Sequence, residues 1–331
     1  MTNTALGSPA RARSAAAPSL WSRFKGWEAS GILIALGLFA IILSIAAPNF
    51  LSAYNLTVVA RAAAFVGLVA LGQTLVLLLG GIDLSVGAAA GLSAIVGSLM
   101  LTSLGVHPWL VIPLACLFGL CLGLVNGFFI AYLKLNPFIV TLASGEIFAG
   151  MTLVITEGYP IRPLGAGFRV FGQGELLGLP VPVWFFLVSA AILIWVLRNT
   201  KFGRNIFAIG GNRDAAVLVG IRIRRVELLV YGLAGMFAAM AGMLYASRMD
   251  AGQPSVGEGW MLQAITAAII GGTSLRGGQG TIVGTALGAL LLAMLANGTV
   301  LLNVSGFWQR VIVGLVVLIA ILVDLARRHR R

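Results

Sequence analysis

The chain alternates long apolar runs with short polar or glycine-rich connections over most of its 331 residues. A helix needs about 20 mostly apolar residues to cross the hydrocarbon core of a bilayer. The apolar runs predict an all-α membrane protein of about ten transmembrane helices. Their bounds are 31–47, 56–79, 85–104, 109–132, 138–156, 181–197, 226–247, 260–275, 281–301 and 307–325. The eighth run contains Gly271 and Gly272, which makes a broken or re-entrant element the alternative to a full span.

The polar segments divide the rest of the chain. Residues 1–30 are rich in Ala, Ser and Pro and predict a flexible cytoplasmic tail ahead of an uncleaved first span. Residues 31–325 form the transmembrane domain, and 326–331 form a basic cytoplasmic tail. Within the domain, 198–225 is the largest predicted inside loop and 157–180 the largest predicted outside loop.

Composition agrees with the pattern of apolar runs. Hydrophobic residues make up 59% of the chain and charged residues 10%, whereas soluble domains carry about 25% charged residues. The net charge of +12 does not indicate nucleic-acid binding, because no long soluble domain is available to present a basic face. An integral membrane protein is predicted.

The distribution of basic residues predicts the orientation. With ten spans and the N-terminus inside, 17 of the 22 Lys and Arg residues fall on the cytoplasmic side. Three fall outside (Arg162, Arg169 and Arg248), and two fall within spans (Arg61 and Arg310). Cytoplasmic loops of membrane proteins are enriched in Lys and Arg. We therefore expect an even number of spans with both termini cytoplasmic.

The chain lacks the common signatures of enzyme chemistry. A phosphate-binding loop needs glycine directly before lysine, and none of Lys25, Lys134 and Lys201 follows a glycine. The two histidines, His107 and His329, are far apart in the sequence, so no paired-histidine metal motif exists. We expect a chain that is not itself an enzyme and binds no metal or cofactor.

Two glycine-rich interruptions of the apolar pattern resemble each other. "LLLGGIDLSVGAAAG" (77–91) and "AIIGGTSLRGGQGTIVG" (268–284) each place two glycines after an apolar run. Matching glycine interruptions in two halves of a transporter point to its substrate site. The likeness is a weak internal repeat, and chance similarity of two glycine-rich turns is the alternative.

Polar residues near these interruptions are candidates for the translocation pathway. A carboxylate at membrane depth is costly and therefore usually functional, and Asp83 with Ser85 is also placed to cap the next helix. Glu146 lies among small residues, and we expect it to be buried and paired with Arg61 or Arg310. The candidates for pathway or structural break are Gly81, Asp83, Ser85, Asn126, Phe138, Thr141, Glu146, Gly271 and Gly272.

Glycines spaced four apart predict close helix packing. Gly119, Gly123 and Gly127 share one helix face, and 280–288 repeats the pattern. Such a face serves packing either within one subunit or between two subunits.

The segment "IGGNRDAAVLVGIRIRR" (209–225) is unusually polar for this chain. Asn212 can cap a helix whose first turn carries Asp214, and Gly220 can end it. A helix of about two turns is not stable alone in water, so it needs a surface to dock on. One alternative is a helix lying on the lipid surface; the other is a docking element for a partner protein.

Several segments together resemble the permease subunits of ribose-type sugar ABC importers. They are "GGIDLSVG" (80–87), "NPFIVTLASGEIFAGMTLVITEG" (136–158), "FGRNIFAIGGNRDAAVLVGI" (202–221) and "AAIIGGTSLRGGQGTIVGTALGALLLAMLANG" (267–298). The resemblance runs from about residue 30 to the end of the chain.

This resemblance implies a bacterial inner-membrane permease that moves a monosaccharide or related polyol. It implies four partners: a cytosolic ATPase that uses ATP and Mg, a periplasmic sugar-binding protein, a second permease copy, and membrane lipid. It also implies that the charged segment is the coupling helix that contacts the ATPase. The coupling residues would be Gly211, Asn212, Arg213, Asp214, Ala215, Ala216, Val219 and Gly220.

Two other classes of function compete with this interpretation. An ion- or proton-coupled transporter or channel would use Asp83, Glu146 and Arg61 as a relay, but it leaves 209–225 without a partner. An intramembrane enzyme or assembly protein is the third class. Co-purification with an ATPase would separate the first class from the other two.

Overall fold

The computed structural model describes residues 30–305 together with 308, 311–312, 314–315 and 318. Most of the predicted N-terminal tail, most of the tenth predicted span with Arg310, and the C-terminal tail 326–331 lie outside the described residues.

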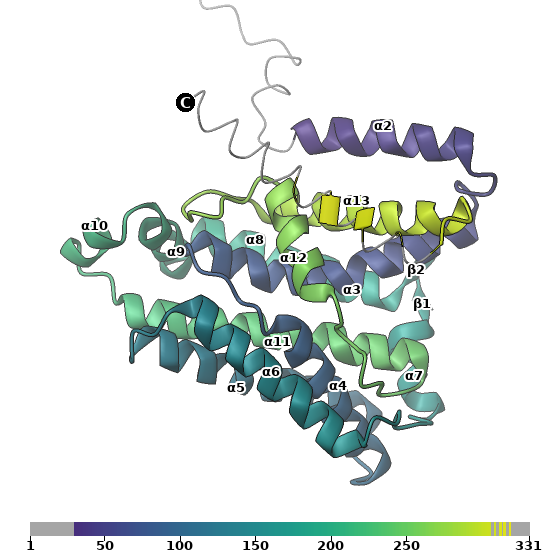
Figure 1. Ribbon diagram of the computed structural model, residues 1–331, viewed down its shortest axis with the longest axis horizontal. Coiled ribbons are helices and arrows are strands. Elements are labelled where there is room, and N and C mark those ends of the chain that lie inside the picture. Colours follow the sequence, from purple (N-terminus) through teal and green to yellow (C-terminus); the bar gives the residue numbers. More distant parts are fainter. Residues whose placement is uncertain (1–29, 306–307, 309–310, 313, 316–317, 319–331) are drawn as a thin grey trace, which may run out of the picture.

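The described chain is almost entirely helical (Figure 1). Six described helices are long and apolar enough to cross a membrane: α3 (Ala53–Leu78), α5 (Pro108–Ala131), α6 (Pro137–Thr156), α8 (Val181–Asn199), α11 (Ile223–Met249) and α13 (Ile282–Leu301). Three shorter apolar helices are α2 (Ser30–Ala46), α4 (Val86–Thr102) and α12 (Trp260–Ile270). The described residues thus contain six helices of spanning length at places where the sequence predicts spans, and three predicted spans are shorter helices.

The eighth predicted span, 260–275, is too long. Its helix α12 has 11 residues, and at 1.5 Å per residue it extends about 16 Å, roughly half the hydrocarbon thickness. The helix ends because Gly272 takes a left-handed conformation with φ +93°. The broken or re-entrant alternative therefore describes this segment better than a full span.

Helix α11 lies at the centre of the molecule and packs against α3, α4 and α5. The glycine face of α5 makes the closest of these contacts. A Cβ atom on Gly123 would lie 2.1 Å from the carbonyl oxygen of Tyr231, and one on Gly127 would lie 2.9 Å from Cα of Leu228. Any larger residue would push the two backbones apart. The predicted glycine face thus packs within the subunit.

The second glycine face also packs within the subunit. Cβ atoms on Gly284 and Gly288 would meet the backbone of Gly271 and Ala267 at 1.9 and 2.1 Å. Helices α12 and α13 therefore cross in direct backbone contact. The threonine hydroxyls of α3 and α13, Thr74 and Thr285, share a buried hydrogen bond of 2.8 Å.

The segments between helices gather at two opposite ends. Helices α9 (Lys201–Gly211) and α10 (Arg213–Leu218) lie at one end. The other end carries α7 (Ala166–Gln173) and the antiparallel strands β1 (Glu175–Leu176) and β2 (Leu179–Pro180) (Figure 1). The predicted outside loop 157–180 is thus a folded element.

Several contacts tie this loop to the end of α11. Ser247 Oγ donates a 2.6 Å hydrogen bond to the carbonyl oxygen of Phe168. Arg169 forms a 3.0 Å ion pair with Asp250, and the backbones of Ile161 and Gly252 pair as an antiparallel bridge. Both segments fall on the predicted outside face, so their pairing is consistent with the predicted alternation of spans.

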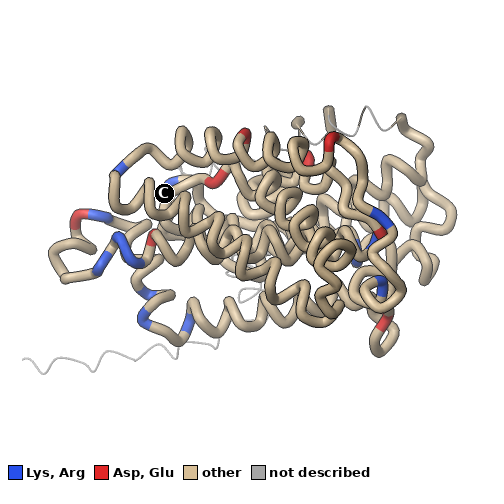
Figure 2. Tube along the Cα trace, turned by 90° about the horizontal axis from the view of Figure 1, so that it is seen from below, with Lys and Arg blue, Asp and Glu red and all other residues tan. Residues whose placement is uncertain are grey.

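Lys and Arg residues lie toward the two ends of the molecule (Figure 2). The end with α9 and α10 carries the larger group of described basic residues. They are Lys134, Arg198, Lys201, Arg204, Arg213, Arg222, Arg224, Arg225 and Arg276. The positive-inside rule therefore favours this end as the cytoplasmic one.

Candidate functional site

The first glycine break, residues 79–85, separates α3 from α4. Helix α3 ends at Leu78, and Gly80, two residues further on, has φ +81°. The N–H of Gly80 donates to Leu77 O at 2.8 Å and that of Gly81 to Val76 O at 3.1 Å. These two hydrogen bonds form a Schellman motif. The motif favours glycine at the left-handed position, because glycine has no Cβ atom to clash there.

Asp83 organises the segment that follows. Its side chain is buried, with the residue 1% exposed, and Oδ1 accepts hydrogen bonds from the Ser85 N–H at 2.8 Å and from Ser85 Oγ at 2.6 Å. Asn126 Nδ2 on α5 donates to Ser85 Oγ at 2.8 Å. Ser85, the residue before α4, makes no side-chain cap bond of its own. The start of α4 therefore depends on the carboxylate of Asp83.

Two further polar residues face the same break. The Gln73 amide, with its oxygen toward the N–H of Asp83, bridges the Asp83 backbone at 3.2 and 3.1 Å. Thr141 on α6 is fully buried and places Oγ1 3.5 Å from the carbonyl oxygen of Ile82. The structure thus brings together Asp83, Ser85, Asn126 and Thr141 as one buried cluster.

Phe138 does not belong to this cluster. Its side chain is 52% exposed at the start of α6, where Asn136 Oδ1 accepts from the Phe138 N–H at 2.9 Å. Phe138 therefore lies on the outer face of the helix and not at the break.

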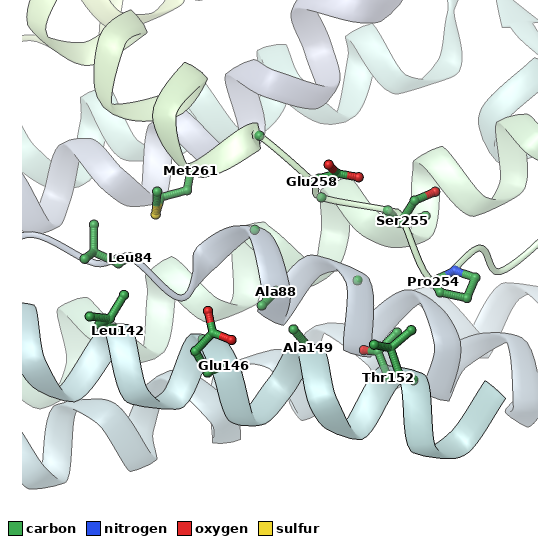
Figure 3. Close-up of a pocket in the computed structure, with 17 residues that line it drawn as sticks. Leu84, Ala88, Leu142, Glu146, Ala149, Thr152, Pro254, Ser255, Glu258 and Met261 are labelled. Carbon is green, nitrogen blue, oxygen red and sulfur yellow. The ribbon is translucent and has the colours of Figure 1, made fainter. Parts of the chain in front are cut away.

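A groove of about 350 Å³ adjoins the cluster (Figure 3). Its walls are α4, α6 and the segment 254–259. A Cβ atom on Gly87 would lie 2.6 Å from the carbonyl oxygen of Gly257, and one on Gly91 would lie 2.6 Å from that of Val256. These two glycines therefore let the 254–259 segment lie directly on α4.

Glu146 lines this groove, contrary to the expectation of a buried ion pair. Figure 3 shows its carboxyl group directed from α6 toward the groove, with Glu258 on the opposite wall. Arg61 Nη2 instead lies 3.9 Å from Oε1 of Glu175 in the 157–180 loop, and Arg310 is outside the described residues. The physical reason is that α6 is peripheral, because only 17% of its most apolar 18-residue stretch is buried.

The second glycine break, residues 271–281, separates α12 from α13. Gly271 is buried against α13, and Gly272 is exposed with open space around its Cα. These predicted site residues do not join the Asp83 cluster. The second break contacts the end of α3, just before the first break, where the Gly278 N–H donates to Leu78 O at 2.9 Å.

Helix α9 fits between the two breaks. A Cβ atom on Gly210 would lie 1.8 Å from Leu78 O and 2.5 Å from the Gly278 nitrogen. Only glycine allows the backbone of α9 to approach both breaks at this distance. The end of α9 is thus in direct contact with both interruptions.

The predicted short helix after α9 is confirmed. Asn212 Oδ1 accepts from the Ala215 N–H at 2.9 Å, α10 spans Arg213–Leu218, and Gly220 with φ +78° follows its end. Gly211, Asn212, Asp214 and Ala215 are exposed. The docking role of this helix stays a prediction.

The surface of α10 differs from the expected one at one residue. Ala216 is 2% exposed and packs into the chain, so it is not available for contact with a partner. Val217, Leu218 and Val219 are instead 59%, 87% and 75% exposed. We call these three residues the α10 apolar patch.

Sequence reasoning missed an acidic residue beside this helix. Arg213 Nη1 donates a hydrogen bond to Glu227 Oε1, within an ion pair. This hydrogen bond raises the pKa of the Arg213 guanidinium. The signal in the sequence was an acid at the start of the apolar span predicted at 226–247, two residues after Arg225.

These features define a helical multi-pass membrane protein with glycine-broken helices and a groove beside a buried polar cluster. Residues 55–321 match the family described as branched-chain amino acid transport system / permease component. The match covers most of the chain, and the chain belongs to this family of transport permeases.

Curated relatives cover nearly the full length. The ribose import permease protein of Bacillus subtilis (strain 168) is 48% identical over 294 residues, 87% of this chain and 91% of the relative. That of Escherichia coli (strain K12) is 38% identical over 299 residues, 88% and 92% of the two chains. The L-arabinose ABC transporter permease protein of Azospirillum brasilense is 35% identical over 325 residues, 98% and 93%. No solved structure matches the chain.

Proposed function

We propose that this chain is the membrane-spanning permease subunit of an ATP-binding cassette importer. The importer moves a monosaccharide or related polyol across a bacterial inner membrane, with both termini of the permease in the cytoplasm. The relatives that carry the names of ribose and arabinose permeases support a sugar as the substrate. ATP and Mg are used by a separate cytosolic ATPase, and this chain binds no cofactor.

The α10 apolar patch is the observation that carries this proposal. Val217, Leu218 and Val219 are exposed on a six-residue helix at the end of the molecule that holds most of the described basic residues. A helix this short depends on contacts for its stability, and a cluster of exposed apolar side chains marks an interaction surface. The ATPase is the partner that a permease needs on its cytoplasmic side.

A pair of variants tests this docking surface. Leu218→Asp places a charge in the patch, and Leu177→Asp places one on a residue that is 83% exposed at the opposite end. Because a buried unpaired charge is costly at an interface, Leu218→Asp should reduce ATPase retention in a pull-down by about tenfold or more. Leu177→Asp should retain the ATPase.

ATP-driven sugar uptake in proteoliposomes provides the functional measurement. The wild-type permease should require the ATPase and its binding protein for uptake. Sugar uptake without any ATPase would favour the ion-coupled transporter instead. Equal ATPase retention by both variants would favour a helix that lies on the lipid surface.

The groove beside α6 is our proposal for part of the sugar pathway. Glu146 projects into it near the middle of α6, and a carboxylate accepts hydrogen bonds from sugar hydroxyls. Glu146→Gln keeps a hydrogen-bonding group of the same size, whereas Glu146→Leu removes it. We expect Glu146→Leu to reduce uptake by about tenfold, the effect of losing one hydrogen bond to a charged group, and Glu146→Gln by much less. Equal uptake by both variants and the wild type would exclude this residue from the pathway.

The remaining partners follow from the same proposal. The end with α7 and the strands would face the periplasm and receive the sugar-binding protein. A second permease copy would complete the membrane complex, with lipid around both copies.

A further inference from the structure

The ion pair between α10 and α11 has no place in the function proposed so far. Glu227 is 6% exposed, and its partner Arg213 is the first residue of the six-residue helix α10. The side chain of Arg213 is 57% exposed. The pair therefore joins an exposed docking helix to the most central helix of the molecule.

Burial of the Glu227 carboxylate costs desolvation free energy, which the ion pair with Arg213 must offset. Its Oε2 atom has no hydrogen-bond partner among the described residues. A buried ion pair can often be replaced by apolar residues without loss of stability, whereas removal of one partner is strongly destabilising. Stability alone would thus be served as well by an apolar contact, and a charge pair adds a directional link that resists separation.

Tyr231 continues the link along α11. It lies four residues after Glu227, on the same face of the helix, and is 2% exposed. A Cβ atom on Gly81 would lie 2.6 Å from the Tyr231 hydroxyl oxygen, which has no hydrogen-bond partner among the described residues. The tyrosine hydroxyl therefore lies directly against Gly81 in the first glycine break, two residues before Asp83.

We propose that Arg213 and Glu227 are positioning residues that transmit docking of α10 to the first glycine break, with Tyr231 against Gly81 as the second contact. This inference rests on the proposed function, because it requires α10 to contact the ATPase. The path runs from Arg213 to Glu227, along one turn of α11 to Tyr231, and from there to the segment that holds Asp83 and the groove wall.

The test measures coupling and not activity alone. Permease, ATPase and binding protein are reconstituted in proteoliposomes, and the number of sugar molecules taken up per ATP hydrolysed is determined. Coupling between two sites typically corresponds to a 5- to 150-fold effect. We expect Arg213→Gln and Glu227→Gln each to lower uptake per ATP by about tenfold, a larger loss than any accompanying loss of ATPase retention.

Two matched variants complete this experiment. Arg225→Gln removes an exposed arginine of the same polar segment, 209–225, and should leave uptake per ATP unchanged. The exchange Arg213→Glu with Glu227→Arg restores an ion pair with reversed polarity and should recover most of the uptake per ATP. A purely structural role predicts that ATPase retention and uptake fall together, while uptake per ATP hydrolysed stays unchanged.

The contact at the break is tested by a second cycle of variants. Gly81→Ala would place a methyl group against the Tyr231 hydroxyl, and Tyr231→Phe removes that oxygen. We expect Gly81→Ala to lower uptake per ATP and the double variant to recover it. Failure of the double variant to recover would remove Tyr231 from the path.

The outcomes separate this inference from the proposed function. Absence of ATP-driven uptake by the wild-type complex would overturn the proposed function itself. Normal wild-type uptake, together with unchanged uptake per ATP in Arg213→Gln and Glu227→Gln, would overturn only the link described here. Glu227→Gln keeps the test decisive if Arg213→Gln does not accumulate, because the arginine that it leaves unpaired has a side chain that is 57% exposed.

Discussion

At 79–85 and at 271–281, an apolar helix ends on a left-handed glycine, Gly80 in the first break and Gly272 in the second. Both ends have the same two backbone bonds, from the left-handed glycine and from the residue after it. A side-chain oxygen then accepts from a backbone N–H two residues on. Asp83 does so for Ser85, and Ser274 for Arg276.

The two breaks use this common turn differently. In the first, the acceptor is a buried carboxylate whose partner Ser85 connects to α5, and α4 begins at once. The second is longer and carries its extra glycines, Gly277 and Gly278, against the backbones of Gly80 and Gly210. A shared local turn thus supports a polar cluster beside the groove in one half and a backbone joint with α9 in the other.

The largest expected effect comes from breaking the backbone contact of α9 with the two breaks. Gly210→Ala would place Cβ 1.8 Å from Leu78 O, so the backbones of α9 and α3 must separate. Overpacking costs about 1–3 kcal/mol where neighbours can yield, and backbone atoms yield least. We expect a marked loss of monodisperse protein in size-exclusion chromatography. The neighbouring Gly211 has open space around it, so Gly211→Ala should be silent, and a similar loss there would contradict the joint.

A smaller effect is expected where the two acceptors are removed. Asp83→Leu leaves the Ser85 N–H and hydroxyl without their acceptor, and each unsatisfied buried group costs about 1–3 kcal/mol. Asp83→Asn keeps Oδ1 and should retain most of the stability. Ser274→Ala removes the 3.2 Å bond from the Arg276 N–H to a neutral, half-buried side chain and should cost less than Asp83→Leu. Thermal unfolding in detergent measures all three, and equal shifts for Asp83→Leu and Ser274→Ala would remove the distinction between the breaks.

The smallest expected effect compares the two left-handed glycines. Alanine in this conformation costs about 1–2 kcal/mol. On Gly272 the new Cβ would meet nothing within 4 Å, whereas on Gly80 it would lie 3.0 Å from Arg276 O. Gly80→Ala should therefore lower the melting temperature more than Gly272→Ala. The reverse order would mean that the contact between the breaks is not close.

The sequence by itself determined the features that depend on neighbouring residues. Apolar runs located the helices, because burial in lipid or protein requires continuous apolar surface. Asn212 and Gly220 located the ends of α10, because capping involves residues only a few positions apart. The paired glycines located both breaks, although not which glycine of each pair is left-handed.

Only the tertiary structure decided the features that depend on distant residues. Glu146 faces a groove because α6 is peripheral, Ala216 is buried by the fold around α10, and α12 stops after 11 residues, about half the length that a full span needs. The Arg213–Glu227 pair joins residues 14 positions apart, and Gly210 meets Leu78 and Gly278 from two other segments. The hydrophobic pattern gives each helix its apolar character, but which neighbour covers a given face depends on contacts between segments that are far apart in the chain.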